Sequence, residues 1–389
     1  MANFKTRARA LDLLGRQQIA GIPTAINELL KNAHDAYADN VDIDYFRIND
    51  LFVLRDDGVG MSKEDFETRW LTLGTESKVI HRKSSPPPID PSKPKRVAMG
   101  EKGIGRLAIA SIGKQVLIVT KAKNQEEITA ALINWQIFEL PGLNLEDIVI
   151  PIRTLTELPN KLTIDSMKEE LIESIDKLLA QDDITDTEYT NIESTIKAFN
   201  AVPSDLHHKL NRSNDLKDYQ SSGTYFFVSP VDETLKFDLD GSSVGKEATK
   251  IEKMLMGFHN TMTPDHPQPI LDIIFRDYRV SDGTYVDVID KEQFFTVDDF
   301  EVADHHFKGH FDEFGQFKGT IKVYQEKTYE HIVNWTGNNF NKTSCGPFEI
   351  NLAYVQGKKN QTILNNEDFA RIIAKADKFG GLYVYKDNI

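Results

Sequence analysis

The sequence contains one cysteine, no apolar run long enough to cross a membrane, and fewer basic than acidic residues. Because a lone thiol cannot form an internal disulfide, we expect Cys345 to be a small buried residue of a cytoplasmic protein. Without a long apolar run or a signal-peptide core, we expect neither a membrane protein nor a secreted one. Lys and Arg total 46 against 60 Asp and Glu. The net charge of −14 argues against a nucleic-acid interface over the whole surface, although a local basic patch stays open.

What is present is the composition of a globular protein. The 389 residues are 27% charged and 40% hydrophobic, which suits two or three packed domains. Apolar residues recurring every three to four positions predict a helix over 22–38, and alternation predicts a strand over 41–46. A buried strand over 51–54 then leads to Asp56. Further elements are expected as a helix over 104–112 and strands over 116–120 and 224–228.

Two later regions have a different pattern. Residues 155–220 carry two helical stripes and indicate an inserted αα-hairpin, in which Ser166 and Glu169 have the spacing of a capping box. Beyond Pro230, short strands alternate with turns, so we expect a first domain over 1–230 and a second over 231–389. The second domain is expected to contain a helix over 367–378 and strands over 270–275, 319–324, 348–355 and 382–385.

Three polar residues of the first long helix share one face. Glu28, Asn32 and Asp35 are spaced by four and three residues. For this helix alone, a solvated polar face is the simpler interpretation. A carboxylate can instead act as a general base toward water, and an amide oxygen can ligate magnesium. The choice between the two depends on the glycine motifs that follow.

The segment Asp56-Asp57-Gly58-Val59-Gly60-Met61 follows the predicted buried strand. A carboxylate at a strand end can accept a hydrogen bond from the exocyclic amine of adenine, where guanine presents an oxygen. Gly58 and Gly60 allow a close approach of the backbone, and Met61 can pack on a base. An ordinary Asp-Gly surface turn is the alternative.

A third motif, Gly100-Glu101-Lys102-Gly103-Ile104-Gly105, precedes a predicted helix and can cradle phosphates with its backbone. It is neither a Walker A loop nor a dinucleotide fingerprint, because no Gly-Lys-Ser/Thr follows and the glycine spacing is reversed. We expect Lys102 to reach a terminal phosphate, with a solvated lysine as the alternative. A separate cluster of His305, His306 and His310 lacks the regular ligand spacing of a metal site.

Together with Gly223-Thr224, these motifs in this order resemble the GHKL ATPase superfamily, which includes DNA gyrase B, the large heat-shock chaperone, histidine kinases, MutL and the MORC proteins. Residues 7–39 look like those of bacterial MORC-like members. The resemblance implies an α+β Bergerat fold, a two-layer sandwich with helices on one face of a mixed sheet. It further implies an S5-like transducer domain over 231–389. Because the pattern of that group normally continues beyond the closing KFGGLYVYKDNI, we expect a C-terminally truncated transducer.

The resemblance also implies the site, with ATP and Mg²⁺ as ligands. It assigns Glu28 as the general base, Asn32 as the magnesium ligand and Asp35 as a residue that orients its neighbours. Gly74–Lys78 matches the base of an ATP lid over 75–100. In two-domain members a lysine of the second domain reaches the terminal phosphate, and Lys358 and Lys359 are equal candidates for that role. The implied nucleotide contacts are Asn32, Asp35, Asp56, Gly58, Gly60, Met61, Thr75, Ser77, Lys78, Gly100, Glu101, Lys102, Gly103, Ile104, Gly105 and Thr224.

The implied function is Mg-dependent ATP hydrolysis that drives lid closure and N-terminal homodimerisation. Phosphotransfer of the histidine-kinase type is an alternative, but the first histidine, His34, lies inside the first motif rather than on an upstream helix. A non-hydrolysing ATP-sensing or chaperone-like module is a third interpretation, against which Glu28 argues. By family analogy, DNA handling or phage defence is the expected setting, with a DNA or protein partner bound through the missing C-terminal region.

Overall fold

The structure is a computed structural model that divides into two compact units. It describes residues 6–15, 19–72, 91, 93–100, 105–181, 184–206, 210, 216, 221–241, 247–263, 270–289, 294–333 and 341–385. The first unit comprises Met1–Gly241, Lys250–Leu255 and Ile270–Ile289, and the second comprises Ser242–Thr249, Met256–Pro269 and Asp290–Ile389. The described residues contain no helix with the length and apolar character needed to cross a membrane.

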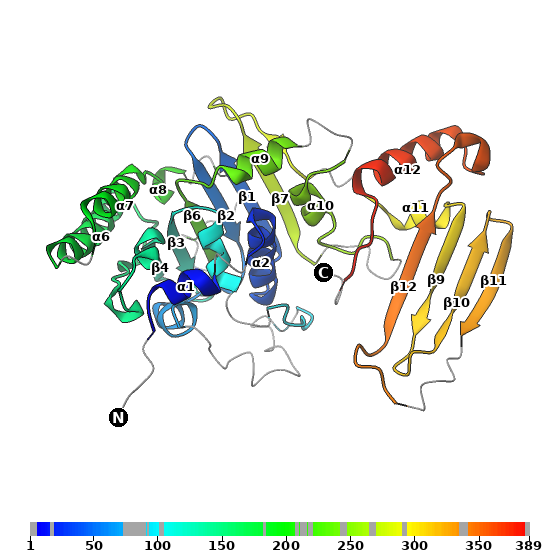
Figure 1. Ribbon diagram of the computed structural model, residues 1–389, viewed down its shortest axis with the longest axis horizontal. Helices are drawn as coiled ribbons and strands as arrows, with labels where there is room; N and C mark the ends of the chain where they lie inside the picture. Colours follow the sequence, from blue (N-terminus) through cyan, green and yellow to red (C-terminus); the bar gives the residue numbers. More distant parts are fainter. Residues whose placement is uncertain are drawn as a thin grey trace. The chain divides into compact units, whose positions relative to one another are not determined.

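The first unit is built on an eight-stranded mixed sheet of order β5-β4-β3-β6-β2-β1-β7-β8 (Figure 1). Neighbouring strands are antiparallel except β1 and β7, which run parallel. Strands β2, β3, β4 and β6 are buried along their whole length. The strands are β1 (Asn40–Phe46), β2 (Leu51–Asp56), β3 (Gln115–Lys121), β4 (Ile128–Asn134), β5 (Ile152–Leu155), β6 (Gly223–Val228), β7 (Asp272–Tyr278) and β8 (Val286–Asp287).

Helix α2 (Ile22–Asp35) covers part of this sheet together with the 3₁₀ helix η3 (Gly105–Ser111) (Figure 1). Its apolar stripe, which includes the fully buried Ile26 and Leu30, faces inward and confirms the helix expected from the sequence. The α-helix expected over 104–112 is a 3₁₀ helix in its described part. The other short helices are α1 (Arg9–Leu14), α3 (Lys63–Asp65), the π-helical η2 (Phe66–Trp70), α5 (Gln136–Glu139), η4 (Leu145–Asp147), α8 (Pro203–Leu206), α9 (Thr234–Asp240) and α10 (Lys250–Met256).

Strand β7 extends the first unit past the boundary expected at residues 230 and 231. Its parallel pairing with β1 brings Arg276 next to two aspartates of β1, with Arg276 to Asp44 at 2.7 Å and to Asp42 at 2.6 Å. Arg55 of β2 donates a further bond to Asp44 at 3.0 Å. All four side chains are buried, so each buried charge has a partner. The strand expected at 270–275 therefore belongs to the first sheet.

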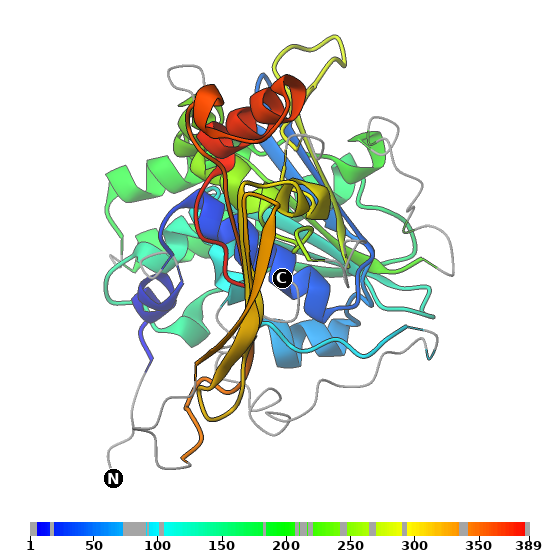
Figure 2. The same cartoon turned by 90° about the vertical axis from the view of Figure 1, so that its right-hand side faces the viewer.

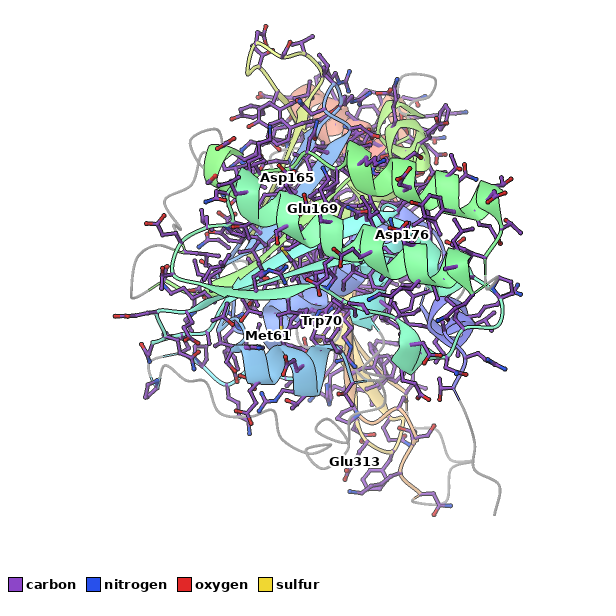
Figure 3. All side chains as sticks on the ribbon, turned by 90° about the vertical axis from the view of Figure 1, so that its left-hand side faces the viewer. Met61, Trp70, Asp165, Glu169, Asp176 and Glu313 are labelled. Carbon is purple, nitrogen blue, oxygen red and sulfur yellow. The ribbon has the colours of Figure 1, made fainter. Side chains whose placement is uncertain are left out.

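The inserted αα-hairpin is confirmed as α6 (Lys161–Ala180) and α7 (Asp186–Ala198). Arg153 of β5 attaches the hairpin to the edge of the sheet through Glu170 at 2.8 Å. Figure 3 shows the acidic residues Asp165, Glu169 and Asp176 following one another along α6. The capping box expected at Ser166 and Glu169 is wrong, because both lie inside α6, which Asn160 caps. The capping box lies at the start of α7 instead, between Thr185 and Glu188.

The second unit has a four-stranded antiparallel sheet of order β11-β10-β9-β12. In Figures 1 and 2, α12 lies beyond one end of this sheet rather than along a face. The segment 382–385, expected as a strand, is not one. Cys345, expected to be buried, is exposed because it lies in the turn before β12. The elements are α11 (Val297–Glu301), β9 (His305–Phe311), β10 (Phe317–Val323), β11 (Lys327–Val333), β12 (Phe348–Tyr354), the 3₁₀ helix η8 (Lys359–Gln361) and α12 (Asn366–Phe379).

The histidine cluster of this unit is divided between the two faces of β9. His305 and His306 are adjacent in the strand, so their side chains point to opposite faces. The side chain of His306 makes a hydrogen bond with that of Asn351 on β12, with Nε2 and Oδ1 separated by 2.6 Å. Among the residues that the structure describes, no three histidine, cysteine or carboxylate side chains converge as metal ligands.

Candidate nucleotide site

Asp56 lies at the end of β2 with only 6% of its surface exposed. Its Oδ1 accepts a hydrogen bond from the backbone N–H of Gly58 at 2.9 Å. Burial raises the pKa of Asp56 to about 7, and the neighbouring charge of Asp57 adds to this, while hydrogen bonds from Gly58 and Thr224 oppose it. A buried carboxylate whose bonds leave acceptor capacity unused suits a ligand that brings its own donor.

Thr224 lies directly across from Asp56 in the β2–β6 pair. Its hydroxyl lies 3.0 Å from the hydroxyl of Thr120 on β3. Thr120 also donates to the carbonyl of Gly223 at 3.0 Å and accepts from the backbone N–H of Met61 at 3.0 Å. One threonine thus connects the second motif to the fourth.

The sequence did not identify Thr120 or Ser222 as part of this site. Thr120 is a polar residue in an otherwise apolar strand, and that was the available signal. Ser222 donates to the carbonyl of Gly58 at 2.7 Å and so joins the same two segments from the other side. The contacts of Thr120 with Thr224 and of Ser222 with Gly58 link residues more than 100 positions apart, and such pairing follows from the sheet topology.

Gly60 is required by the close approach of the backbone at this end of the site. Its φ is +60°, and a Cβ built there would lie 1.9 Å from the carbonyl oxygen of Lys121. Any side chain would therefore separate the loop that carries Met61 from the end of β3. Gly60 thus permits a close approach between two backbone segments, while the expected approach to a base stays a prediction.

The opposite end of the site holds Glu28 of α2 against the start of η3. A Cβ built on Gly105 would lie 2.7 Å from Glu28 Oε2, so the carboxylate occupies the space that a side chain would fill. The other oxygen of Glu28 pairs with Lys31 Nζ at 2.9 Å, and both side chains are 27% exposed. The structure therefore brings the carboxylate of the first motif to the last glycine of the third.

Asn32 and Asp35 continue the same face of α2 but differ in their contacts. Asn32 is half-buried, and its side-chain amide makes no hydrogen bond to the part of the chain that is described. Its oxygen is thus available to a hard cation such as Mg²⁺, for which an amide oxygen is a suitable ligand. Asp35 instead accepts from the backbone N–H groups of Met99 at 2.7 Å and Gly100 at 3.0 Å. Asp35 therefore fixes the start of the third motif.

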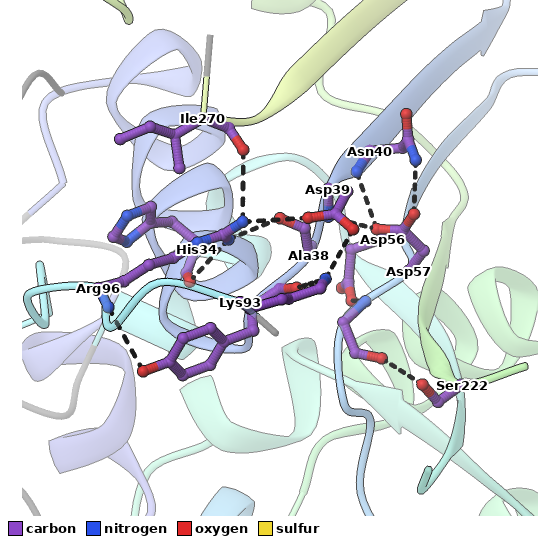
Figure 4. A network of polar contacts seen from close by, with 12 residues as sticks. His34, Ala38, Asp39, Asn40, Asp56, Asp57, Lys93, Arg96, Ser222 and Ile270 are labelled. Carbon is purple, nitrogen blue, oxygen red and sulfur yellow. Dashed lines mark hydrogen bonds and ion pairs between the residues drawn. The ribbon is translucent and has the colours of Figure 1, made fainter. Parts of the chain in front are cut away.

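The segment before the third motif is tied to the end of α2 (Figure 4). Arg96 donates to the carbonyl of Ala38 at 2.6 Å, and its guanidinium lies 5.5 Å from the ring centre of Tyr37. Lys93 donates to the carbonyl of Tyr37 at 2.9 Å and pairs with Asp39 at 2.6 Å. These cations satisfy carbonyls at the helix C-terminus, a favourable place for positive charge.

Several expected contacts lie outside the described residues. They are Thr75, Ser77, Lys78, Glu101, Lys102, Gly103 and Ile104, together with most of the lid expected at 75–100. Arg106, which follows them, does not point toward a phosphate site. It donates to the backbone carbonyls of Arg69 and Thr72 and so fixes the chain just after η2.

The two candidate lysines of the second unit have different surroundings. Lys359 Nζ donates to the carbonyl of Leu364 and lies 5.6 Å from the ring centre of Phe369. Lys358 is exposed, and its ammonium makes no hydrogen bond or ion pair with described residues. Both lysines lie in the loop between residues 356 and 363. The backbone N–H groups of these two residues donate to the carboxylate of the fully buried Asp304 at 2.8 and 2.9 Å. The loop is therefore held at both ends.

Comparison with known proteins agrees with this geometry. A family model described as histidine kinase-, DNA gyrase B- and HSP90-like ATPase matches residues 21–150, which include both ends of the site apart from the Gly223–Thr224 segment. Over 123 residues the chain is 33% identical to ATPase morc-1 of Caenorhabditis elegans, and the match covers 31% of this chain and 12% of that relative. The mixed sheet and its helices are those of the expected α+β fold. Residues 21–150 are thus similar to the ATPase domains of histidine kinases, DNA gyrase B and HSP90, and the chain is similar to ATPase morc-1 over about an eighth of that protein's length.

Proposed function

We propose that this protein binds and hydrolyses ATP with Mg²⁺ in the first unit. The observation that carries the proposal is the position of Glu28, whose carboxylate lies against Gly105 while the side-chain amide of Asn32, which has no partner among the described residues, lies one helical turn further along α2. At the other end of the site, Asp56 and Thr224 offer acceptor and hydroxyl groups for adenine. The proposed phosphate end is therefore formed by two parts of the chain, α2 and the start of η3.

In the proposed reaction, Glu28 accepts a proton from the attacking water. The water oxygen forms a bond to the γ-phosphorus, the bond from that phosphorus to the bridging oxygen breaks, and ADP and inorganic phosphate leave. Asn32 would hold Mg²⁺, which neutralises charge on the phosphates. Lys31, paired with Glu28 at 2.9 Å, holds one oxygen of the base and leaves the other directed to Gly105.

The remaining contacts of the triphosphate are proposals from the family pattern. We assign Lys102 and the backbone of residues 100–105 to the phosphates, and Thr75, Ser77 and Lys78 to a lid over 75–100. Closure of this lid and N-terminal homodimerisation would follow ATP binding, and domain motion would then limit turnover. A twofold symmetric dimer is the common closed form for such an assembly.

We further propose that the second unit is an S5-like transducer whose Lys358 reaches the terminal phosphate. Lys358 is preferred to Lys359 because the ammonium of Lys359 already has partners within its own unit, Leu364 and Phe369. The ammonium of Lys358 is exposed and has no partner among the described residues, so it can contact a ligand without breaking a described hydrogen bond. DNA handling, by analogy with MORC proteins, is the proposed setting in a cytoplasmic enzyme.

Two other functions use the same pocket. Phosphotransfer to histidine has little support from the structure, because His34 is only 2% exposed and lies within the site helix. A non-hydrolysing ATP-sensing module would have no need for a carboxylate beside Gly105. Radiolabel retained on the protein after incubation with γ-labelled ATP would favour phosphotransfer over hydrolysis.

The decisive experiment replaces the base. Glu28→Ala should bind ATP as the wild type does and accumulate as an ATP-bound dimer, while phosphate release falls by about two to four orders of magnitude. Glu146→Ala, at an exposed residue of η4, is the matched control and should leave both measurements unchanged. Normal phosphate release by Glu28→Ala would remove Glu28 as the base, and failure of the wild type to bind ATP would end the proposal.

A further inference from the structure

Thr120 occupies an unusual position in the β3 strand. It is completely buried, and its single hydroxyl lies 3.0 Å from each of three polar atoms. Those atoms are the backbone nitrogen of Met61, the carbonyl oxygen of Gly223 and the hydroxyl of Thr224. They belong to the two segments that flank Asp56, so this hydroxyl joins both walls at the base end of the site.

The direction of these hydrogen bonds is restricted by chemistry. A backbone N–H can only donate and a carbonyl can only accept, so Thr120 accepts from Met61. Thr120 has one hydrogen of its own, which goes either to Gly223 or to Thr224. Only the first direction gives each of the three contacts a hydrogen, because donation to Thr224 would leave the oxygens of Thr120 and Gly223 facing each other without one. The hydroxyl hydrogen of Thr224 therefore goes to Thr120, and Thr224 presents only its lone pairs, as an acceptor, to a ligand.

We propose that Thr120 is a positioning residue for base selection, which fixes the polarity that Thr224 presents to the purine beside Asp56. The inference rests on the proposed function, since it needs ATP at this site. Thr224 is directly opposite both Asp56 and Thr120 in the strand pairing, so the three side chains occupy one row across β2, β6 and β3. Asp56 and Thr224 would contact the base, whereas Thr120 would act only through Thr224 and Met61.

A fixed polarity matters because purines differ at one edge. Adenine presents an amino donor at C6 and an acceptor at N1, whereas hypoxanthine presents an acceptor at C6 and a donor at N1. A hydroxyl free to rotate can satisfy either edge, as donor to one and acceptor to the other. A hydroxyl held by Thr120 satisfies one edge and opposes the other, which adds discrimination to that of the Asp56 carboxylate.

The test compares ATP with inosine triphosphate, which differs from ATP only at C6 and N1. Thr120→Val keeps the shape of the side chain and removes the hydroxyl, and Thr120→Ser keeps the hydroxyl. We expect Thr120→Val to reduce the ratio of ATP to inosine triphosphate affinity by about three- to tenfold, the range that one neutral hydrogen bond contributes. Thr120→Ser should restore the ratio.

The matched control is Thr129→Val, a buried threonine of β4 that is directly paired with Thr120 and lies on the same face of the sheet. It should leave the affinity ratio unchanged. Thr224→Val gives an independent measurement should Thr120→Val fail to fold, and it should lower the same ratio. In the Thr224→Val background, Thr120→Val should add no further loss of discrimination.

Three results would overturn the inference. If Thr120→Val lowers the affinities for ATP and inosine triphosphate equally, Thr120 has only a structural role. If Thr224→Val leaves the ratio of the two affinities unchanged, Thr120 cannot act through Thr224. An altered ratio in Thr129→Val would show a general effect of the sheet. A wild type that binds ATP and prefers it to inosine triphosphate keeps the proposed function intact in all three cases, whereas no ATP binding at all would overturn both.

Discussion

The two ends of the nucleotide site are built in different ways. At the base end, Asp56, Thr120 and Thr224 are buried and joined by hydrogen bonds to the backbone and to each other. At the proposed phosphate end, Glu28 and Asn32 are half-buried, and the side-chain amide of Asn32 has no hydrogen-bond partner among the described residues. The groups proposed to contact the base are thus held in place by their own hydrogen bonds, while those proposed to contact the phosphates and the cation are less constrained.

The difference has a physical reason. Recognition of one base requires fixed donors and acceptors, which strands supply with little freedom. Hydrolysis requires charged groups that change partners during the reaction, and these lie on the exposed side of a helix. Under the proposed function, a rigid sheet would select the base and a helix would supply the chemistry.

The largest contrast is expected between two glycine substitutions. Gly60→Ala places a Cβ 1.9 Å from the carbonyl of Lys121, so we expect loss of ATP binding and a large fall in melting temperature. Gly105→Ala meets Glu28 Oε2 at 2.7 Å, the end of a flexible side chain that can move aside. It should fold and bind ATP but hydrolyse it poorly. Calorimetric melting and phosphate release measure both variants, and equal effects of the two would contradict the contrast.

A smaller effect is expected from the carboxylate of the base end. Asp56→Asn replaces an acceptor of the adenine amine by an amide, and we expect ATP affinity to fall by about ten- to hundredfold, as for a hydrogen bond to a charged group. Asp57→Asn is the control at the neighbouring position, since Asp57 accepts from the backbone N–H groups of Asp39 and Asn40 and holds a turn. Titration calorimetry with unchanged affinity in Asp56→Asn would assign adenine recognition elsewhere.

Asp56→Asn should also remove a pH dependence of ATP affinity. Because the pKa of Asp56 is about 7, the ionised acceptor decreases as the pH falls, and ATP should bind about tenfold more weakly at pH 6 than at pH 8. In the unbound protein, the raised pKa means that ionised Asp56 destabilises the fold above pH 7 and ceases to do so as the pH falls toward 4. Asp56→Asn should therefore raise the melting temperature at pH 8 more than at pH 5.

The smallest effect is expected at the phosphate end. Asn32→Ala removes one oxygen ligand from a cation that retains several waters, so Mg-ATP affinity should fall only severalfold. ATP affinity in the presence of a chelator should be unchanged, because Asn32 is assigned to the metal alone. An equal loss with and without Mg²⁺ would indicate that Asn32 contacts the nucleotide directly.

Local pattern was enough to predict much of the first unit. The apolar stripe of α2, the alternation of β1 and the buried run of β2 each specify one element and one inward face. For the same reason Glu28 and Asn32 could be placed on a shared surface, and Gly105 could be expected near them.

The features that could not be predicted depend on the pairing of strands that are far apart in the sequence. Thr120 has no local signal beyond a polar residue in an apolar strand, and its role follows from β3 lying next to β6. The boundary expected at residue 230 missed the return of β7 to β1, which the 270–275 pattern does not reveal. The exposed Cys345 and the irregular 382–385 segment show that composition alone does not determine burial or strand pairing.

That return of β7 has a consequence for any shortened form of the protein. A fragment ending near residue 230 would expose the backbone of β1 as a new sheet edge, a template for aggregation. It would also leave Asp42 and Asp44 without the guanidinium of Arg276, two interior negative charges repelling each other. The smallest autonomous nucleotide-binding fragment should accordingly reach Ile289, and a shorter one should be insoluble rather than merely inactive.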